Sequence, residues 1–403
     1  MRCLSPLFFF ALFSYAQAQS SAKQTIPDFK EKPSVHWTFR VATPIIASPL
    51  VSDNLVYFGA LDSTFYALDT RSGKISWKLK TRGQIRSTPL VTGNILYLNG
   101  GDGNLYCLDK MTGKIKWTFA SNGEKKYDFA DYHQSSPILY NNTVYFGSGD
   151  GNVYAVKADN GTKRWSYQTG NIVHTTPAID NNKVFVGSFD GYVYALDVAS
   201  GALVWKFKTL GHRFFPAGEV QGSPVVAKGL VFIGARDYNV YAIDQNKGYC
   251  HWNKAFTRGW GLANTIHDSV LHIGGADERV LIAAVPETGR EYWKKPMEFL
   301  IFGSNAYSES MFYAGTTIGK LHGIDARTGE KVWTVTTEGY SKNRLKYFKP
   351  DDAYRDDIYT IIKSNEHFLE VEYELGGIFS TPAITPDLLI FTTTEGTVYC
   401  LRR

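Results

Sequence analysis

The sequence predicts an all-β fold, an eight-bladed β-propeller with four antiparallel strands in each blade. A tryptophan returns with a period near 40 residues, which is the period of a propeller blade. A Ser/Thr-Pro pair, or a degenerate copy of it, opens each period, so eight similar units follow one another. The tryptophans are Trp37, Trp77, Trp117, Trp165, Trp205, Trp252, Trp293 and Trp333, spaced 40 to 48 residues apart.

One unit is clearest between Val144 and Trp165. An alternating apolar run meets a tight turn at Asp150-Gly151, and a second run meets a turn at Asp159-Asn160-Gly161. Three strands joined by two turns follow from this pattern. We expect the Ser/Thr-Pro segment to supply the fourth strand of each unit. These segments are Ser48-Pro49, Thr88-Pro89, Ser136-Pro137, Thr176-Pro177, Ser223-Pro224, Thr381-Pro382 and the degenerate Asn264-Thr265 and Asn305-Ala306.

The ring is expected to close through the two ends of the chain. The last unit stops at Arg403, before its tryptophan strand, while an unassigned strand, Val35–Phe39, precedes the first Ser-Pro. Pairing this N-terminal strand into the last blade would remove an exposed sheet edge. Because each blade packs only on its neighbours, residues 34–403 can form one domain despite their number.

The turns that follow the third strands are expected to be structural. In Asp69 to Gly73 the aspartate can accept backbone hydrogen bonds, and the glycine supplies a positive φ. The tryptophan after each such turn fits best as a packing residue between blades, with a polar ring nitrogen. Cys107 and Cys400 occupy the same repeat position and Cys250 stands apart, which favours small packing residues over a disulfide framework.

The N-terminus has the pattern of a secretory signal peptide. Arg2 precedes an apolar run from Leu4 to Phe13, and Ala16-Gln17-Ala18 offers a small-residue cleavage site. The run is shorter than the roughly 20 residues of a membrane-spanning helix. We therefore expect a signal peptide at 1–18, a linker at 19–33, and a soluble periplasmic or extracellular protein.

Composition argues against nucleic acid as a partner. The formal net charge is +5, and no dense Lys/Arg cluster occurs along the chain. No metal site is expected either, because His267 and His272 are five residues apart and no His-Glu-x-x-His motif is present. The chain is expected to be a monomer.

Two repeats carry a resemblance to a known family. Tyr66-Ala-Leu-Asp69 with Trp77, and Tyr194-Ala-Leu-Asp197 with Trp205, match the pattern Tyr-Ala-Leu-Asp-x-x-Thr/Ser-Gly-x-x-x-Trp. At these residues, and over about 34–403, the chain resembles the quinoprotein-type (PQQ-like) propeller repeat. Exported proteins with this repeat include PQQ-dependent dehydrogenases and non-catalytic BamB-like scaffolds of outer-membrane assembly.

In length and in having little beyond eight blades, the chain is more similar to the scaffolds. The resemblance implies an exported non-catalytic protein that binds envelope proteins and needs no cofactor. The alternatives are a PQQ-dependent oxidoreductase, with PQQ and calcium, and a propeller that binds a small ligand or a glycan. The chain lacks the adjacent cysteine pair of the quinoprotein alcohol dehydrogenases, the Cys-x-x-Cys-His haem motif, and the lipoprotein cysteine typical of BamB.

Three insertions, 121–133, 210–220 and 338–376, lie between a tryptophan strand and the next Ser/Thr-Pro strand. These connections share one face of the disc with the Asp-Gly turns, and loops on a rigid scaffold often bind partners. The longest is predicted to hold a hairpin of Ile358–Ile362 and Phe368–Leu375 that caps the ring, offers an edge to a partner, or is a solvated flap. In the hairpin, Glu370, Glu372 and Glu374 are expected on one face. The candidate partner residues are Tyr127, Phe129, Arg213, Phe214, Phe215, Glu370 and Glu372. The alternative is that the three insertions have no role in binding.

A second candidate site is the mouth of the central funnel. The residues three before each proline, or equivalent to them, are Ile46, Arg86, Gln134, His174, Gln221, Leu262, Gly303 and Phe379. If they point inward, one arc of the funnel is polar and the other apolar. The hypothesis is a ligand or peptide site with Arg86 as the anion anchor and His174 as a hydrogen-bond partner; the alternative is a water-filled channel.

Trp260 is the one tryptophan outside the repeat register. Flanked by Gly259 and Gly261, its ring could stack on a flat ligand such as a quinone or a sugar. The alternative is that it fills the gap around the degenerate sixth unit.

Overall fold

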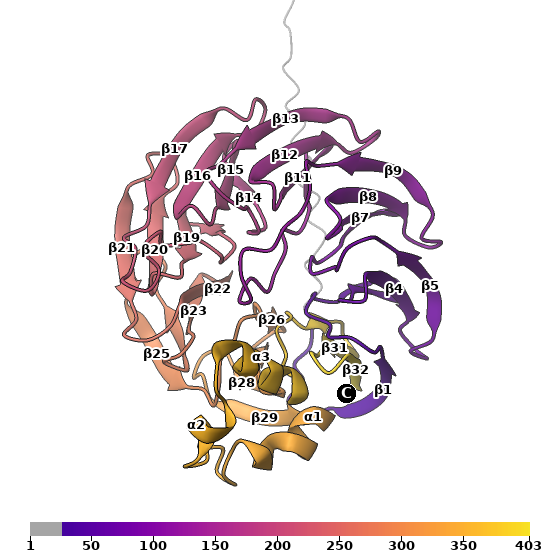
Figure 1. Ribbon diagram of the computed structural model, residues 1–403, viewed down its shortest axis with the longest axis vertical. Helices are drawn as coiled ribbons and strands as arrows, with labels where there is room; N and C mark the ends of the chain where they lie inside the picture. Colours follow the sequence, from indigo (N-terminus) through magenta and orange to yellow (C-terminus); the bar gives the residue numbers. More distant parts are fainter. Residues whose placement is uncertain (1–25) are drawn as a thin grey trace, which may run out of the picture.

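The computed structural model describes residues 26–403, apart from the side chain of Asn264, and shows an eight-bladed β-propeller. Eight separate four-stranded antiparallel sheets surround a central axis (Figure 1). The predicted fold class and the number of blades are confirmed. The predicted signal peptide at 1–18 lies outside the described residues.

Each blade runs from an inner strand to an outer tryptophan strand. Blade 1 contains β2 (Leu50–Ser52), β3 (Leu55–Gly59), β4 (Thr64–Asp69) and β5 (Ile75–Lys80), and blade 2 contains β6 (Leu90–Thr92), β7 (Ile95–Asn99), β8 (Asn104–Asp109) and β9 (Ile115–Ala120). Blade 3 contains β10 (Ile138–Tyr140), β11 (Thr143–Gly147), β12 (Asn152–Lys157) and β13 (Lys163–Gln168), and blade 4 contains β14 (Ala178–Asp180), β15 (Lys183–Gly187), β16 (Tyr192–Asp197) and β17 (Leu203–Lys208). Blade 5 contains β18 (Val225–Ala227), β19 (Leu230–Gly234), β20 (Asn239–Asp244) and β21 (Cys250–Ala255), and blade 6 contains β22 (Gly261–His267), β23 (Val270–Gly275), β24 (Val280–Ala284) and β25 (Glu291–Pro296). Blade 7 contains β26 (Ala306–Tyr307), β27 (Met311–Gly315), β28 (Lys320–Asp325) and β29 (Lys331–Thr336), and blade 8 contains β30 (Ala383–Ile384), β31 (Leu388–Thr392), β32 (Thr397–Arg402) and β1 (Ser34–Arg40).

The N-terminal strand closes the ring. β1 pairs antiparallel with β32, with Ser34 opposite Arg402 and Arg40 opposite Thr397, and forms the outer strand of the last blade. Thus the first and the last described strands meet in one sheet, and this edge of the last blade is paired as expected.

The tryptophans join neighbouring blades, as the repeat predicted. The Trp77 indole donates a hydrogen bond of 3.0 Å to the Lys110 carbonyl of the next blade. Gly113 lies against the same ring, where an added Cβ would stand 2.4 Å from a ring carbon. The turn chemistry is confirmed as well, because Asp69 accepts bonds from the amides of Arg71 and Ser72. The other indoles donate to the carbonyls of Thr70, Ala158, Val198, Gln245, Pro286, Ala326 and Phe29.

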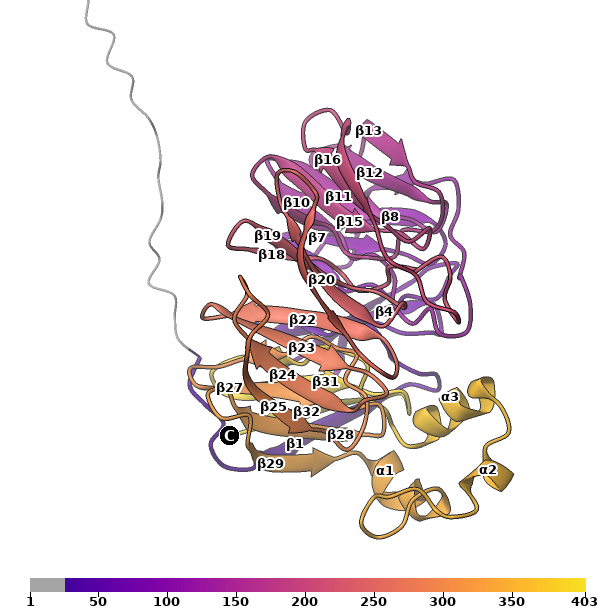
Figure 2. The same cartoon turned by 90° about the vertical axis from the view of Figure 1, so that its left-hand side faces the viewer.

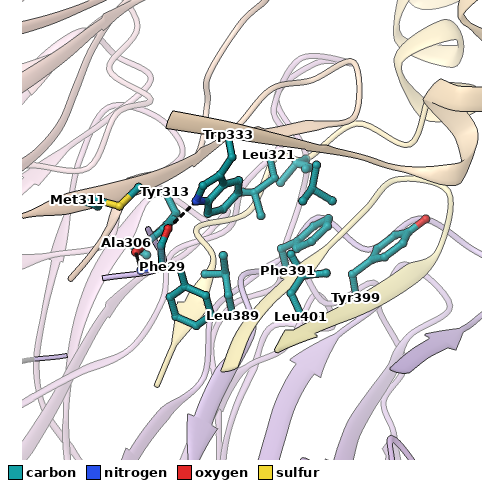
Figure 3. Close-up of a cluster of buried hydrophobic side chains, with 12 residues drawn as sticks. Phe29, Ala306, Met311, Tyr313, Leu321, Trp333, Leu389, Phe391, Tyr399 and Leu401 are labelled. Atoms are coloured by element: carbon teal, nitrogen blue, oxygen red, sulfur yellow. Dashed lines mark hydrogen bonds between the residues drawn. The ribbon is translucent and has the colours of Figure 1, made fainter. Parts of the chain in front are cut away.

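The segment predicted as a linker is packed where the structure describes it. Phe29 is buried against Tyr313, with ring centroids 5.8 Å apart, and its carbonyl accepts the indole hydrogen bond of Trp333 (Figure 3). In blade 8 the fourth strand is β1, which is not joined to the third strand, β32, by a turn. Phe29 supplies the carbonyl that the turn after the third strand gives the preceding tryptophan in other blades, so this part of the expected linker contributes to the closure of the ring.

The three cysteines between residues 26 and 403 are unpaired, as predicted. Cys107 and Cys400 are buried and Cys250 is half-buried, and none of the three forms a disulfide. Burial raises the pKa of the Cys107 thiol to about 11. These residues act as small packing side chains.

The longest insertion is helical, so the predicted hairpin is wrong. It contains α1 (Glu338–Asn343), the 3-10 helix η1 (Arg344–Lys346), α2 (Ile358–Ile361) and α3 (Asn365–Glu374). The Ser364 hydroxyl caps α3 by accepting a bond from the His367 amide, and Phe368, Val371 and Leu375 pack on the ring at helical spacing. The edge view of Figure 2 shows the three helices extending beyond the strands on one side.

No helix between residues 26 and 403 is both long and apolar enough to cross a membrane.

Candidate functional site

The insertion at 121–133, here called the plug, folds into the funnel from the face that carries the insertions. Figure 1 shows this part of the chain, between β9 and β10, as a purple loop inside the ring. Ala130, Asp131 and Tyr132 are buried there, although they belong to a loop. The sequence placed the insertion on the correct face but did not indicate that it turns inward.

A buried charge network holds the plug on its polar side. His174 is hydrogen-bonded through Nδ1 to Asp131 at 2.8 Å and through Nε2 to Glu124 at 2.6 Å. Burial opposes the charge on His174, but its bonds to the two carboxylates outweigh burial and raise its pKa above 6.5. Burial also acts to raise the pKa of Asp131. The hydrogen bond and charge of His174, together with the charge of Arg86, outweigh burial, so the pKa of Asp131 is lowered. The imidazolium and the two carboxylates thus stabilise one another.

Two further polar residues of the funnel, Arg86 and Gln221, bind the plug through its backbone. Arg86 donates from Nη1 to the carbonyls of Asp131 and His133, and Gln221 donates to the Ala130 carbonyl at 2.9 Å. These three contacts satisfy plug carbonyls that would otherwise be buried without partners.

Arg236 lines the candidate site and binds the plug, but the sequence reasoning missed it. Its side chain is 1% exposed, binds both carboxylate oxygens of Asp128, and donates from Nε to Gln221 at 2.8 Å. The guanidinium also lies over the Trp260 ring, 4.6 Å from its centroid. One signal in the sequence could have identified it. Arg236 stands before the aspartate of its turn, at the position where the preceding blade has the apolar residue Phe189.

The apolar side of the funnel receives Tyr132. Its ring lies 5.1 Å from that of Phe302 and 5.0 Å from that of Phe379. Leu369 and Tyr373 of α3 pack against the same cluster, so the helical insertion also covers the plug. The predicted polar and apolar arcs are both present, and together they position one loop.

The structure brings the predicted funnel residues together but changes what they do. Arg86, Gln134, His174, Gln221, Trp260 and Phe379 all line one cavity of about 480 Å³ beneath the plug. Both ring nitrogens of His174 are occupied by the plug carboxylates, so His174 has no free nitrogen for a ligand. Binding of a ligand in the funnel stays a prediction.

The predicted partner residues divide into exposed and buried groups. Phe214 is 62% exposed with Arg213 stacked over its ring, and Phe129 is also exposed. The Tyr127 ring is partly exposed, while its hydroxyl donates to Glu219 at 3.0 Å. Phe215 turns inward against Trp260, with centroids 5.9 Å apart, and is not free for a partner.

Glu370, Glu372 and Glu374, predicted to lie on one face of a hairpin, do not share a face, because the segment is a helix. Glu370 is exposed, whereas Glu372 is 1% exposed and points to the opposite side of α3. Burial raises the pKa of Glu372 to about 8. Glu372 is therefore a buried, protonated acid at neutral pH and not a surface contact.

No cluster of three or more His, Cys, Asp or Glu side chains that could bind a metal occurs within residues 26–403. The carboxylates of the plug are already engaged: Asp131 and Glu124 with His174, and Asp128 with Arg236. A calcium-assisted quinone site needs converging free carboxylates, and this donor set does not fit one.

Comparison with known proteins agrees with the fold and the repeat. A family model described as outer membrane protein assembly factor BamB matches residues 22–191 and 189–403. No curated protein matches the sequence.

Several solved structures have the same fold at low sequence identity. BamB from Moraxella catarrhalis is 15% identical with a TM-score of 0.64, covering 93% of this chain and 98% of that one. The computationally designed Ika8 protein is 16% identical with a TM-score of 0.69, covering 92% and 100%. Quinohemoprotein alcohol dehydrogenase from Comamonas testosteroni is 14% identical with a TM-score of 0.65, covering 91% of this chain and 76% of the enzyme. On the family match, this chain belongs to the family of the outer membrane protein assembly factor BamB.

Proposed function

We propose that the protein is an exported, non-catalytic scaffold that binds another protein of the cell envelope through the face carrying the three insertions. Membership of the BamB family supports a role in protein binding. The engaged carboxylates of the plug support a role without catalysis, since a general acid or base has to reach a substrate.

The observation that carries the proposal is the exposure of apolar side chains on all three insertions. In the first insertion Tyr127 is 37% exposed and Phe129 36%, in the second Leu210 is 72% exposed and Phe214 62%, and in the third Tyr359 is 89% exposed. Each comes from an insertion fixed at both ends to a rigid ring, so ordering on binding costs little conformational entropy. Aromatic residues flanked by basic ones, such as Phe214 beside Arg213, have the composition of protein interfaces.

The compartment is part of the proposal. The sequence at 1–18 has the pattern of a signal peptide, which would deliver a soluble monomer to the periplasm or the extracellular medium. Fractionation of cells that produce the full chain tests this point. Retention of an uncleaved chain in the cytoplasm would contradict it.

Site-specific photo-crosslinking in intact cells tests the binding face. A crosslinking amino acid at Leu210 or Phe214 is expected to trap one envelope protein. The control is Tyr249, 50% exposed at a turn between β20 and β21 on the opposite face. Equal crosslinking at Tyr249, or no crosslinking at either loop position, would contradict the proposed face.

A PQQ-dependent oxidoreductase is the second candidate, supported by the fold likeness to quinohemoprotein alcohol dehydrogenases. Calorimetric titration with pyrroloquinoline quinone, with and without calcium, tests it directly. Tight calcium-dependent binding at one site would favour the enzyme over the scaffold. Absence of binding is the result expected from the engaged carboxylates.

A further inference from the structure

The cavity beneath the plug is separate from the loop surface. It is bounded above by the plug and the residues that hold it, and laterally by the inner strands. It adjoins a second hollow along β2 and β30, which share with it Ser48, Thr88 and Thr381. The cavity therefore extends from the plug toward the face opposite the insertions.

Three side chains at the top of the cavity keep unused hydrogen-bonding groups. Gln134 is buried, and its Oε1 accepts no hydrogen bond from the described residues. Arg86 uses only Nη1 for the plug, which leaves Nε and Nη2 without hydrogen bonds to the described chain. The His133 imidazole lines the cavity and, within residues 26–403, has no hydrogen-bond partner for either ring nitrogen.

The chemistry of these groups restricts the ligand. Gln134 Oε1 needs a donor, while the Arg86 guanidinium needs an acceptor and favours an anionic one. Burial and the charge of Arg86 lower the pKa of His133 to about 4, so the neutral ring offers one donor and one acceptor. A simple carboxylate provides no donor for Gln134, and a simple alcohol provides no charge for Arg86.

Hydroxyl groups surround the lower part of the cavity. The hydroxyl oxygens of Ser136, Thr176 and Ser223 each accept an amide hydrogen bond from the preceding blade, at 2.9 to 3.1 Å. Each keeps its own proton for a further bond. Trp260 and Phe302 line the opposite, apolar side, where the C–H face of a sugar ring can pack.

We propose that this cavity binds a small sugar acid, a molecule that carries several hydroxyl groups and one carboxylate. The carboxylate pairs with Arg86, a hydroxyl donates to Gln134, and His133 bonds a second hydroxyl. A cavity of 480 Å³ lies within the range of ligand sites and is large enough for a hexuronate. This inference is independent of the partner that the loop face binds.

Calorimetric titration of the mature protein with D-glucuronate tests the proposal. Saturable binding at one site is expected, with D-glucose and cyclohexanecarboxylate each at least tenfold weaker, because glucose lacks the charge and cyclohexanecarboxylate lacks the hydroxyls. Equal binding of glucuronate and glucose, or no saturable heat with glucuronate, would overturn it.

Two variants connect binding to the cavity. His133→Ala removes a side chain without hydrogen bonds to the described chain, so the protein should fold, and glucuronate should bind about tenfold more weakly. Gln134→Leu should have an effect of the same order. The matched control His367→Ala lies on α3 away from the cavity and should bind as the wild type does. Unchanged affinity in both cavity variants, with unfolding curves like that of the wild type, would overturn the site.

Discussion

Replacing His174 with alanine tests whether a buried charge network keeps the plug in the funnel. The change removes hydrogen bonds of 2.8 Å to Asp131 and 2.6 Å to Glu124, and leaves both carboxylates buried without their cation. Breaking a buried ion pair from one side costs about 3–5 kcal/mol. Asp131 keeps a bond from the Tyr127 amide, so we expect the lower end, about 3 kcal/mol.

This free energy is expected to be lost from closure of the plug and not from the blades, because the plug is a loop attached to a complete ring. Lys125 and Lys126 are already exposed in the closed plug, but trypsin cleaves efficiently only where the backbone around the lysine opens locally, which requires the plug to leave the funnel. When opening and closing are fast, cleavage follows the open population, and about 3 kcal/mol corresponds to cleavage roughly 100-fold faster. Thermal unfolding of the blades should change little. The control is His251→Ala, which removes a half-exposed histidine from an outer strand.

The pH dependence of trypsin cleavage shows which ionisable side chains hold the plug closed. The pKa of His174 is raised on folding, so its contribution is full below pH 6.5 and declines as pH rises through the folded pKa. The pKa of Asp131 is lowered, so its contribution is present above pH 3.8 and is lost as pH falls through the folded value. The rate at which trypsin cleaves the wild type, divided by its rate on an unfolded peptide at the same pH, should rise as pH increases through the folded pKa of His174. The His174→Ala variant should not show this rise. Equal cleavage of wild type and variant across this range would refute the reasoning.

Three further predictions concern the ring and its insertions. Phe29→Ala should lower the free energy of unfolding in urea by about 3–5 kcal/mol, because a buried aromatic ring leaves a cavity where the ring closes; a change below 1 kcal/mol would show that the N-terminal segment does not support closure. Glu372→Gln should raise stability at pH 7 by up to about 3 kcal/mol, because the raised pKa of the wild-type acid costs stability as pH rises from 4.5 toward 8. That advantage should vanish below pH 4, and a constant difference at every pH would argue against a buried neutral acid. Phe214→Asp should change the unfolding free energy by less than about 0.5 kcal/mol and abolish the crosslink from Leu210, whereas Tyr249→Asp should leave that crosslink intact.

The repeat could be understood from the sequence because its rules are local. Each Trp and each Asp-to-Gly turn recurs with the same neighbours, so one blade predicts the next, as Trp77 and Gly113 show. Ring closure was also predictable, since Val35–Phe39 had no other strand to pair with. The cysteines followed from their repeat position.

The insertions were harder because nothing repeats in them. In Phe368–Leu375, alternating polar and apolar residues suggested a strand, but Phe368, Val371 and Leu375 also fit a helix, and the Ser364 cap decides for the helix. Segments of this length are ambiguous without their tertiary contacts. The predicted role of Glu372 was wrong for the same reason.

By itself the sequence determined the all-β class, the eight blades and their closure, because these depend on short-range patterns repeated along the chain. It also identified several residues that line the funnel, but not Arg236. Only the tertiary structure decided that the plug turns inward and that His174 serves it. The contacts of His174 join residues 43 and 50 positions apart, and Arg236 reaches Asp128 over 108 positions. Such contacts exist only once the ring has brought the blades together, so no local pattern records them.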